Sequence, residues 1–181
     1  EEIQKDQLRF RKNLERIGEL FAYEISKQLK YKNVNTETPL GEAETRVLDN
    51  NLVLSTIMRA GLPLHQGLMN IFDKAQNAFV SAYRKHHKDG SFDVKVEYVS
   101  SPTLDSKVLV ISDPMLATGH SMVLAYRELL NKGKPEHVHL VSTVASAQGI
   151  EELKKELSDT NITLWIAALD YELTAQAYIV P

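Results

Sequence analysis

The sequence predicts an α/β protein with a mostly parallel central sheet flanked by helices. In its second half, short apolar segments alternate with helical segments, the order in which parallel strands and crossover helices follow one another. In its first half, the segment 52–58 is apolar without alternation, which is typical of a strand buried on both faces. A length of 181 residues suits one domain, so we expect residues 1–181 to form a single one.

The composition excludes several classes of protein. The formal net charge is −3 and there is no cysteine. Nucleic-acid-binding domains usually carry a basic excess, and without cysteine there are no disulfides, thiolate nucleophiles or cysteine-ligated zinc sites. No apolar segment approaches the ~20 residues of a membrane span. We therefore expect a cytoplasmic protein whose partners include neither nucleic acid nor a membrane.

The first half begins with a predicted amphipathic helix. Apolar residues recur at steps of three and four from Phe10 to Leu29 and form one helical face. A polar stretch around 33–41 separates this helix from the strand 52–58, and a helical pattern follows over 62–71.

A β-hairpin is predicted next. Residues 78–83 have the composition of a strand, and 92–98 alternate apolar and polar side chains. Asp89-Gly90 between them is a turn signal. We expect this hairpin to protrude as an arm and to contact a second subunit, because an isolated hairpin is only marginally stable in water.

The second half is regular. Strands are predicted at 108–111, 138–144 and 163–169, and helices at 121–131 and 149–157. In open α/β sheets, ligands bind beyond the carboxyl ends of the strands, where the strand order reverses. The chemistry is therefore expected in the loops that follow the predicted strands, after these residues: Met58, Tyr83, Ile111, Val144 and Leu169.

The loop 112–121 is the most informative of these. Its second half, 117–121, is rich in small and hydroxylic residues and enters a helix, where successive backbone N–H groups favour a phosphate. Thr118 and Ser121 can add hydroxyl donors. In the alternative interpretation, Gly119 only forms a turn and Ser121 caps the helix. The chain contains neither G-x-x-x-x-G-K-[ST] nor G-x-G-x-x-G, so neither a P-loop nor a dinucleotide fold is supported.

Asp113 precedes this phosphate cradle by about the width of a sugar. Its carboxylate can accept hydrogen bonds from a vicinal diol or face a Mg²⁺ that the diol coordinates. The alternative is an Asp-Pro turn initiator.

Residues 108–121 resemble the phosphoribosyl-diphosphate (PRPP) signature of type I phosphoribosyltransferases. The form Asp-Pro-Met-Leu-Ala-Thr-Gly at 113–119 is similar to that of the uracil phosphoribosyltransferase family. Three further segments match in order and spacing: Arg59-Ala60-Gly61-Leu62, Tyr83-Arg84 and Tyr178-Ile179-Val180-Pro181. The resemblance covers essentially the whole chain and implies the type I phosphoribosyltransferase fold.

The implied reaction is uracil plus PRPP to UMP plus pyrophosphate, with Mg²⁺ carried on PRPP. The catalytic residues would be Asp113, Arg59 and Arg84, and Ile179 would contact uracil. The PRPP contacts carried over from the family are Arg59, Ala60, Gly61, Arg84, Asp113, Pro114, Met115, Leu116, Ala117, Thr118, Gly119, His120 and Ser121. The resemblance implies that the protein alone holds no metal. The Mg²⁺ would arrive on PRPP, and Asp113 is its candidate protein ligand. Members of this family are often dimers or larger homo-oligomers, and GTP activates some.

Two departures from the family pattern stand out. His120 replaces a second glycine of the cradle, and the chain stops at Pro181, where the family continues with a Gly-rich, base-reading tail. We expect the start and the tail to belong to a longer protein. Two other functions stay open: a nucleotide-binding regulator with the same fold, and an enzyme of this fold for another nucleobase.

The remaining candidates have simpler interpretations. Without the resemblance, Arg59 and Arg84 are compatible with solvated basic positions. Adjacent His86 and His87 point to opposite faces of a strand and cannot share a metal ion. Trp165 is expected in the core, and Asp170, at the end of the last strand, is expected near the base.

Overall fold

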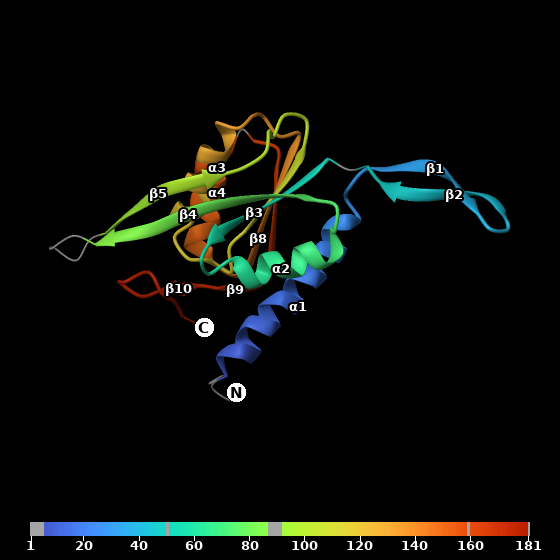
Figure 1. The fold of residues 1–181 in the computed structure, drawn as a ribbon. Coiled ribbons are helices and arrows are strands. Elements are labelled where there is room, and N and C mark those ends of the chain that lie inside the picture. The colour runs from blue at the N-terminus through green and yellow to red at the C-terminus, as the bar shows by residue number, and fades with distance from the viewer. Residues whose placement is uncertain (1–5, 50, 87–91, 159, 181) are drawn as a thin grey trace.

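A single sheet organises the computed structural model, which describes residues 6–49, 51–86, 92–158 and 160–180, with only the backbone at 84–86 and 92–94. Its strand order is β5-β4-β3-β6-β8, and both β7 and β9 also pair with β8. All of these pairs are parallel except β4 with β5. The strands of this sheet are β3 (Leu52–Met58), β4 (Gln76–His86), β5 (Phe92–Ser100), β6 (Val108–Ser112), β7 (Met115–Leu116), β8 (His137–Ser146) and β9 (Ile162–Asp170). The mostly parallel sheet is confirmed (Figure 1).

Four helices cover the two faces of this sheet: α1 (Gln7–Ser26), α2 (Leu62–Ile71), α3 (His120–Leu130) and α4 (Ala147–Glu156). On one face, α1 and α2 bury Phe21, Ile25 and Leu64 against β3, β6 and β8. On the other face, α3 and α4 bury residues such as Met122 and Leu153. The sheet therefore has a helical layer on each side, as its apolar central strands require. None of the described helices is long and apolar enough to cross a membrane.

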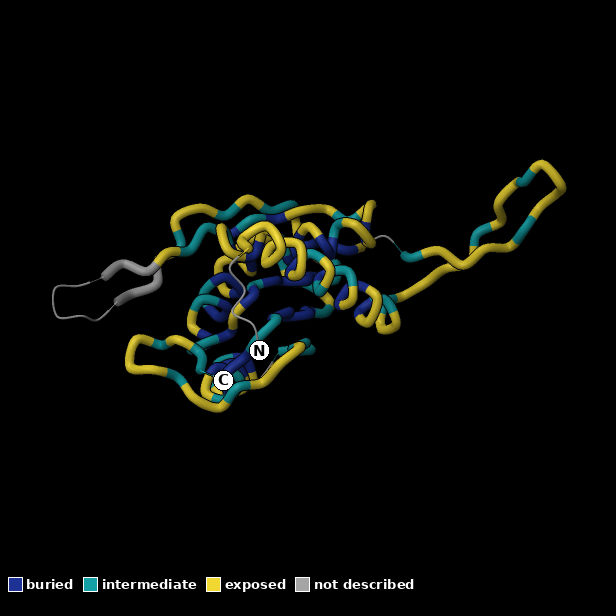
Figure 2. Tube along the Cα trace, turned by 90° about the horizontal axis from the view of Figure 1, so that it is seen from below, coloured by how far each residue is buried: buried dark blue, intermediate teal, exposed yellow. Residues whose placement is uncertain are grey.

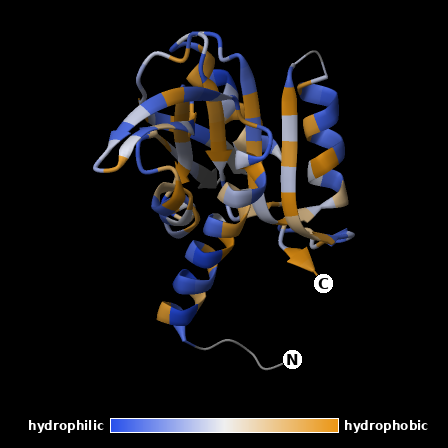
Figure 3. Cartoon of the chain, turned by 90° about the vertical axis from the view of Figure 1, so that its right-hand side faces the viewer, coloured by the Kyte–Doolittle hydropathy of each residue, from blue (hydrophilic) through white to orange (hydrophobic). Residues whose placement is uncertain are grey.

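The predicted helices and strands of the second half are confirmed within a few residues. Two strands extend further than their patterns indicate, β4 to His86 and β8 to Ser146. Helix α1 ends at Ser26, so Leu29 lies beyond it, and Phe10 is 46% exposed instead of lying in the core. In Figure 3, α1 carries hydrophilic positions together with some hydrophobic ones. Trp165 is half-buried against the core under α1 and α2.

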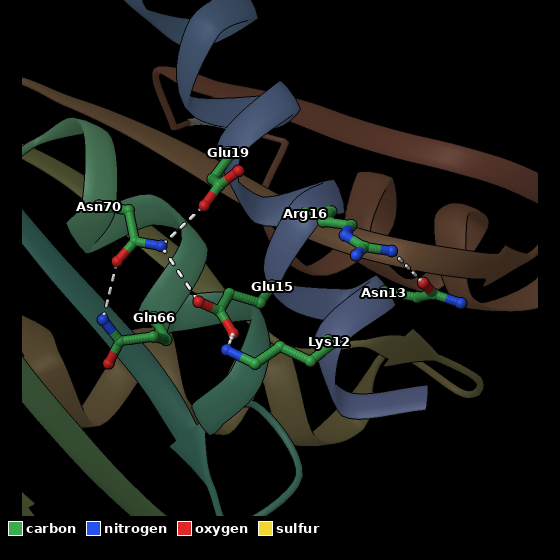
Figure 4. Close-up of polar contacts among 7 residues, drawn as sticks. All are labelled: Lys12, Asn13, Glu15, Arg16, Glu19, Gln66 and Asn70. Carbon is green, nitrogen blue, oxygen red and sulfur yellow. Dashed lines mark hydrogen bonds and ion pairs between the residues drawn. The ribbon is translucent and has the colours of Figure 1, made fainter. Parts of the chain in front are cut away.

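A polar clasp joins α1 to α2. Asn70 of α2 donates to Glu15 and Glu19 of α1, at 3.2 and 2.7 Å (Figure 4). Lys12 donates to Glu15 at 2.6 Å, and this hydrogen bond, with that of Asn70, lowers the pKa of the Glu15 carboxyl. Helix α2 directly follows the loop after β3. The clasp therefore holds α2 against α1 and so holds the end of this loop in place.

Two hairpins extend from the body. The predicted one is confirmed as β4 and β5, which pair antiparallel; its turn, including Asp89 and Gly90, lies outside the described residues. Val96 of this hairpin packs against the core of its own chain, so its side chain does not need a second subunit to cover it.

The second hairpin, β1 (Tyr31–Thr38) with β2 (Gly41–Leu48), forms a separate two-stranded sheet in the stretch that we expected only to be polar. Its residues are mostly exposed on both faces, and it reaches away from the body on the side opposite the other hairpin (Figures 1 and 2). The sequence did not indicate this hairpin because neither of its strands alternates between apolar and polar residues.

Candidate active site

A cavity of about 720 Å³ lies at the carboxyl ends of the central strands. The chain runs from β3 outward to β4 on one side, and β6 pairs with β3 on the other, so the strand order reverses here. Five predicted residues meet in its wall: Arg59, Ala60, Asp113, Met115 and Ser121. The other lining residues are Ile57, Met58, Ser81, Ala82, Tyr83 and Glu97. Residues of both predicted loops therefore line the same cavity.

The loop after β3 presents Arg59 and Ala60 as exposed residues at the rim. The Met58–Arg59 peptide bond is cis. The Gly61 amide, predicted to face pyrophosphate, donates to the Ile57 carbonyl at 3.1 Å. A Cβ at Gly61 would lie 2.1 Å from the Thr56 hydroxyl oxygen. Glycine is thus required at 61 by packing against the protein's own strand, and in this structure its amide serves the turn.

Asp113 is held at the end of β6 by its neighbour β8. Its amide donates to the Val141 carbonyl at 3.0 Å, and the Pro114 carbonyl accepts from the amides of Thr143 and Val144, both at 3.1 Å. The chain then rejoins β8 as β7. These bonds place the half-buried Asp113 at the cavity wall, opposite the loop of Arg59.

The cradle 117–121 has the geometry of an anion site. Gly119 adopts a φ of +80° and is the N-cap of α3, without a side-chain cap. The cap is therefore at Gly119, and the alternative with Ser121 as the cap is wrong. The first intrahelical bond runs from the Val123 amide to the Gly119 carbonyl. The amides of the first turn thus have no partner within the helix. Ser121 of this turn lines the cavity, and the helix dipole favours a negative charge here.

His120 replaces glycine without a backbone penalty. The left-handed conformation falls on Gly119, and His120 is the first residue of α3. Its side chain is exposed. A side chain at 120 is therefore compatible with the cradle, since the cradle uses backbone amides.

Helix α4 supports the cradle from behind, which the sequence did not indicate. Ser146, the N-cap of α4, donates its hydroxyl to the Ala117 carbonyl and accepts from the Gly149 amide. A Cβ at Gly149 would lie 2.5 Å from the Ala117 carbonyl oxygen. Leu116 is buried in the core under α3 and α4. Its side chain therefore anchors the loop, whereas Thr118 and Ala117 are half-buried.

A second cavity, of about 540 Å³, adjoins the first and shares Arg59, Ala60, Asp113 and Met115 with it. Its other walls are Gln7, Phe10, Arg11, Leu14, Leu62, Pro63 and Pro114. Most of these side chains are apolar, and Phe10, predicted to lie in the core, instead lines this cavity. The predicted base contact Ile179 lies elsewhere, in the short hairpin of β10 (Glu172–Leu173) and β11 (Ile179–Val180). This hairpin follows Asp170, the half-buried last residue of β9.

Most of the lining residues that the sequence missed come from the β4–β5 hairpin. Ser81 pairs with Tyr98 and Ala82 with Val96, so Glu97 is an additional residue in β5, a β-bulge. The Glu97 carboxylate raises the pKa of the Tyr83 hydroxyl. The side chain of Arg84 lies outside the described residues, as do that of His86 and all of His87.

Solved structures with a similar fold identify the class. A protein from Aquifex aeolicus has a TM-score of 0.89 and 27% identity, covering 98% of this chain and 83% of its own. A hypoxanthine phosphoribosyltransferase from Staphylococcus aureus has a TM-score of 0.57 at 12% identity, covering 90% of this chain and 76% of its own. The fold is therefore that of the type I phosphoribosyltransferases.

The family follows from two sequence comparisons. The model of the uracil phosphoribosyltransferase family matches residues 3–181. A uracil phosphoribosyltransferase from Porphyromonas gingivalis is 53% identical over 179 residues, covering 99% of this chain and 82% of the relative. This chain belongs to the uracil phosphoribosyltransferase family.

Proposed function

We propose that this protein transfers the ribose 5-phosphate group of PRPP to N1 of uracil, forming UMP and releasing pyrophosphate. The observation that carries the proposal is the cavity at the switch point, which joins the loop of Arg59 to the loop from Asp113 to Ser121. One loop is basic, and the other opens a helix whose first amides favour phosphate. A substrate with phosphate groups at both ends of a ribose matches this arrangement. Membership of the family supports the same reaction.

Different residues would bind successive parts of PRPP. The cradle at the start of α3 binds the 5-phosphate, and Arg59 with the Ala60 backbone binds the diphosphate. Asp113 accepts hydrogen bonds from the ribose hydroxyls, beside the carbon where positive charge develops. The C1–oxygen bond to pyrophosphate breaks, the bond from N1 of uracil to C1 forms, and N1 loses its proton. Positioning both reactants and neutralising the leaving group account for the catalysis.

Magnesium fits this site. Asp113 lines the cavity with carboxylate oxygens, the donors that Mg²⁺ prefers. When bound with PRPP, the cation would neutralise charge on the diphosphate. Arg84 is proposed as a second diphosphate contact, and Ile179 as a contact to uracil. We also propose that residues 1–181 act as one domain, because both cores are built on the same sheet.

The test is PRPP-dependent release of pyrophosphate, measured with uracil, cytosine, orotate, hypoxanthine and adenine in parallel on the full-length protein. Release with uracil and formation of UMP are expected. If pyrophosphate is released only with another base, that base is the substrate instead of uracil. PRPP binding without release of pyrophosphate would favour a regulator. Repeating the assay with added GTP tests the effector that some relatives use.

A homodimer or larger homo-oligomer is also proposed, with the β1–β2 hairpin as the arm that reaches the second copy. Leu40 at its turn is fully exposed, and a two-stranded hairpin is marginally stable alone. Leu40→Asp should shift the protein toward monomer in sedimentation. Tyr98→Asp tests the β4–β5 hairpin in the same way, since Tyr98 is 57% exposed. If neither variant changes the sedimentation profile, the arm proposals are wrong.

A further inference from the structure

The wall of the active-site cavity contains a carboxylate that the reaction as described does not use. Glu97 comes from β5, the edge strand, and lines the same cavity as Arg59 and Asp113. It reaches the cavity because it is the additional residue of a β-bulge, and bulges next to active sites often redirect a side chain. In a strand without the bulge, side chains would alternate regularly, and Glu97 would point to the face opposite that of Val96 and Tyr98.

The position of Glu97 is on the diphosphate side of the site. The strand order places β4 and β5 beyond β3, whose loop carries Arg59, and β6 with Asp113 on the other side. PRPP extends from the cradle after β6 toward the loop after β3. The end of PRPP nearest β4 and β5 is therefore its diphosphate.

A carboxylate facing a diphosphate is unfavourable unless a cation lies between them. Among the described side chains of this cavity, Arg59 is the cationic one, whereas Glu97 and Asp113 are acidic. Even with Arg84 as the proposed second diphosphate contact, the cationic side chains only equal the two carboxylates in number, so they leave the negative charge of PRPP uncompensated. A divalent cation between Glu97 and the diphosphate removes the repulsion and uses the carboxylate as a ligand.

The strand spacing favours separate cations over one cation shared by both carboxylates. Three strand spacings separate β5 from β6, and at about 4.8 Å each the two backbones are roughly 14 Å apart. The Glu and Asp side chains, with two Mg²⁺–oxygen bonds of about 2.1 Å, span less than this distance. Glu97 and Asp113 would thus act on different cations or at different ends of the substrate.

We propose that Glu97 is a ligand, directly or through one water, of a divalent cation bound to the diphosphate of PRPP, separate from any cation at Asp113. The inference rests on the proposed function, because it requires PRPP in this cavity. Glu97 also interacts with the Tyr83 hydroxyl. The test must therefore distinguish a cation ligand from a residue that only orients Tyr83.

The experiment measures Mn²⁺ binding to the enzyme–PRPP complex without uracil, from the electron paramagnetic resonance signal of free Mn²⁺, with PRPP alone as the reference. Glu97→Gln keeps the size and one acceptor for Tyr83 but removes the charge. It should weaken Mn²⁺ in the complex about tenfold, equivalent to about 1.4 kcal/mol. Calorimetry should show weaker PRPP binding at limiting Mg²⁺ and convergence on the wild type at saturating Mg²⁺.

Tyr83→Phe and Glu42→Gln are the controls. Tyr83→Phe removes the hydroxyl and leaves the carboxylate, so Mn²⁺ binding should stay near that of the wild type. Glu42 is exposed on β2, outside the cavity, and its variant should match the wild type. Unchanged Mn²⁺ binding in Glu97→Gln, or an equal loss in Tyr83→Phe, overturns the proposal. If the wild type binds no PRPP, the proposed function fails first and this inference fails with it.

Discussion

Gly149→Ala should displace the phosphate cradle although Gly149 itself is not among the predicted PRPP contacts. The added methyl group would lie 2.5 Å from the Ala117 carbonyl oxygen and 2.8 Å from that of Leu116. To restore an ordinary contact of 3.4 Å, α4 or the cradle must move by about 0.9 Å. The Ser146 hydroxyl bond to Ala117 couples the same two segments, so a shift of α4 carries the loop with it.

The displacement should appear in PRPP binding. A misplacement of about 1 Å at a binding site can cost about a hundredfold in rate, so kcat/KM for PRPP should fall roughly ten- to a hundredfold. Most of the loss should be a higher KM, because the 5-phosphate carries the same charge in the substrate and in the transition state. Overpacking should also lower the free energy of unfolding by about 1–3 kcal/mol.

Steady-state kinetics with varied PRPP at saturating uracil, together with urea unfolding, measure both effects. Gly133→Ala is the matched control. Its Cβ would lie 2.7 Å from an Asp105 carboxylate oxygen, and Gly133 has a φ of +128° in the loop between α3 and β8, outside the lining of the active-site cavity. The Gly133→Ala protein should be less stable than the wild type and have the same KM for PRPP. A Gly149→Ala protein with reduced stability and wild-type kinetics would refute the idea that α4 positions the cradle.

The other predictions concern three site residues and one buried histidine. Asp113→Asn should lower kcat by roughly two orders of magnitude with a smaller change in KM for PRPP, whereas Arg59→Ala should raise this KM and lower kcat. Steady-state kinetics against PRPP compare them, and loss of PRPP affinity at full kcat in Asp113→Asn would contradict the transition-state role. His120→Gly should change PRPP affinity by less than about tenfold in calorimetry, because the cradle uses amides; a loss of about a hundredfold would mean that the imidazole contacts phosphate. Burial, and secondarily His137, lower the pKa of His139 from 6.5 to about 4, so the unfolded state binds the proton more strongly. The protein should therefore lose up to about 3 kcal/mol as the pH falls from about 6.5 to 4, and His139→Gln should lack this part of the loss in urea unfolding.

Local patterns located most of the fold because burial on a sheet leaves a clear signal in single segments. The unbroken apolar run of β3 and the alternation of strands and helices after residue 108 predicted the central sheet. The β1–β2 hairpin was not predicted because both of its faces are exposed, so its sequence has no apolar period. The turn after Asp113 was found from small residues, since an anion-binding helix start requires them nearby in sequence.

By itself, the sequence determined the four helices, the strands β3, β4, β5, β6, β8 and β9, and the two loops that carry Arg59 and the segment from Asp113 to Ser121. Only the tertiary structure decided how these parts are supported and what else faces the ligand. The bulge that turns Glu97 into the cavity depends on the register between β4 and β5. The approach of Gly149 to Ala117 joins residues 32 positions apart. Such contacts arise when separate elements pack together, and packing across the sheet leaves no periodic signal within either segment.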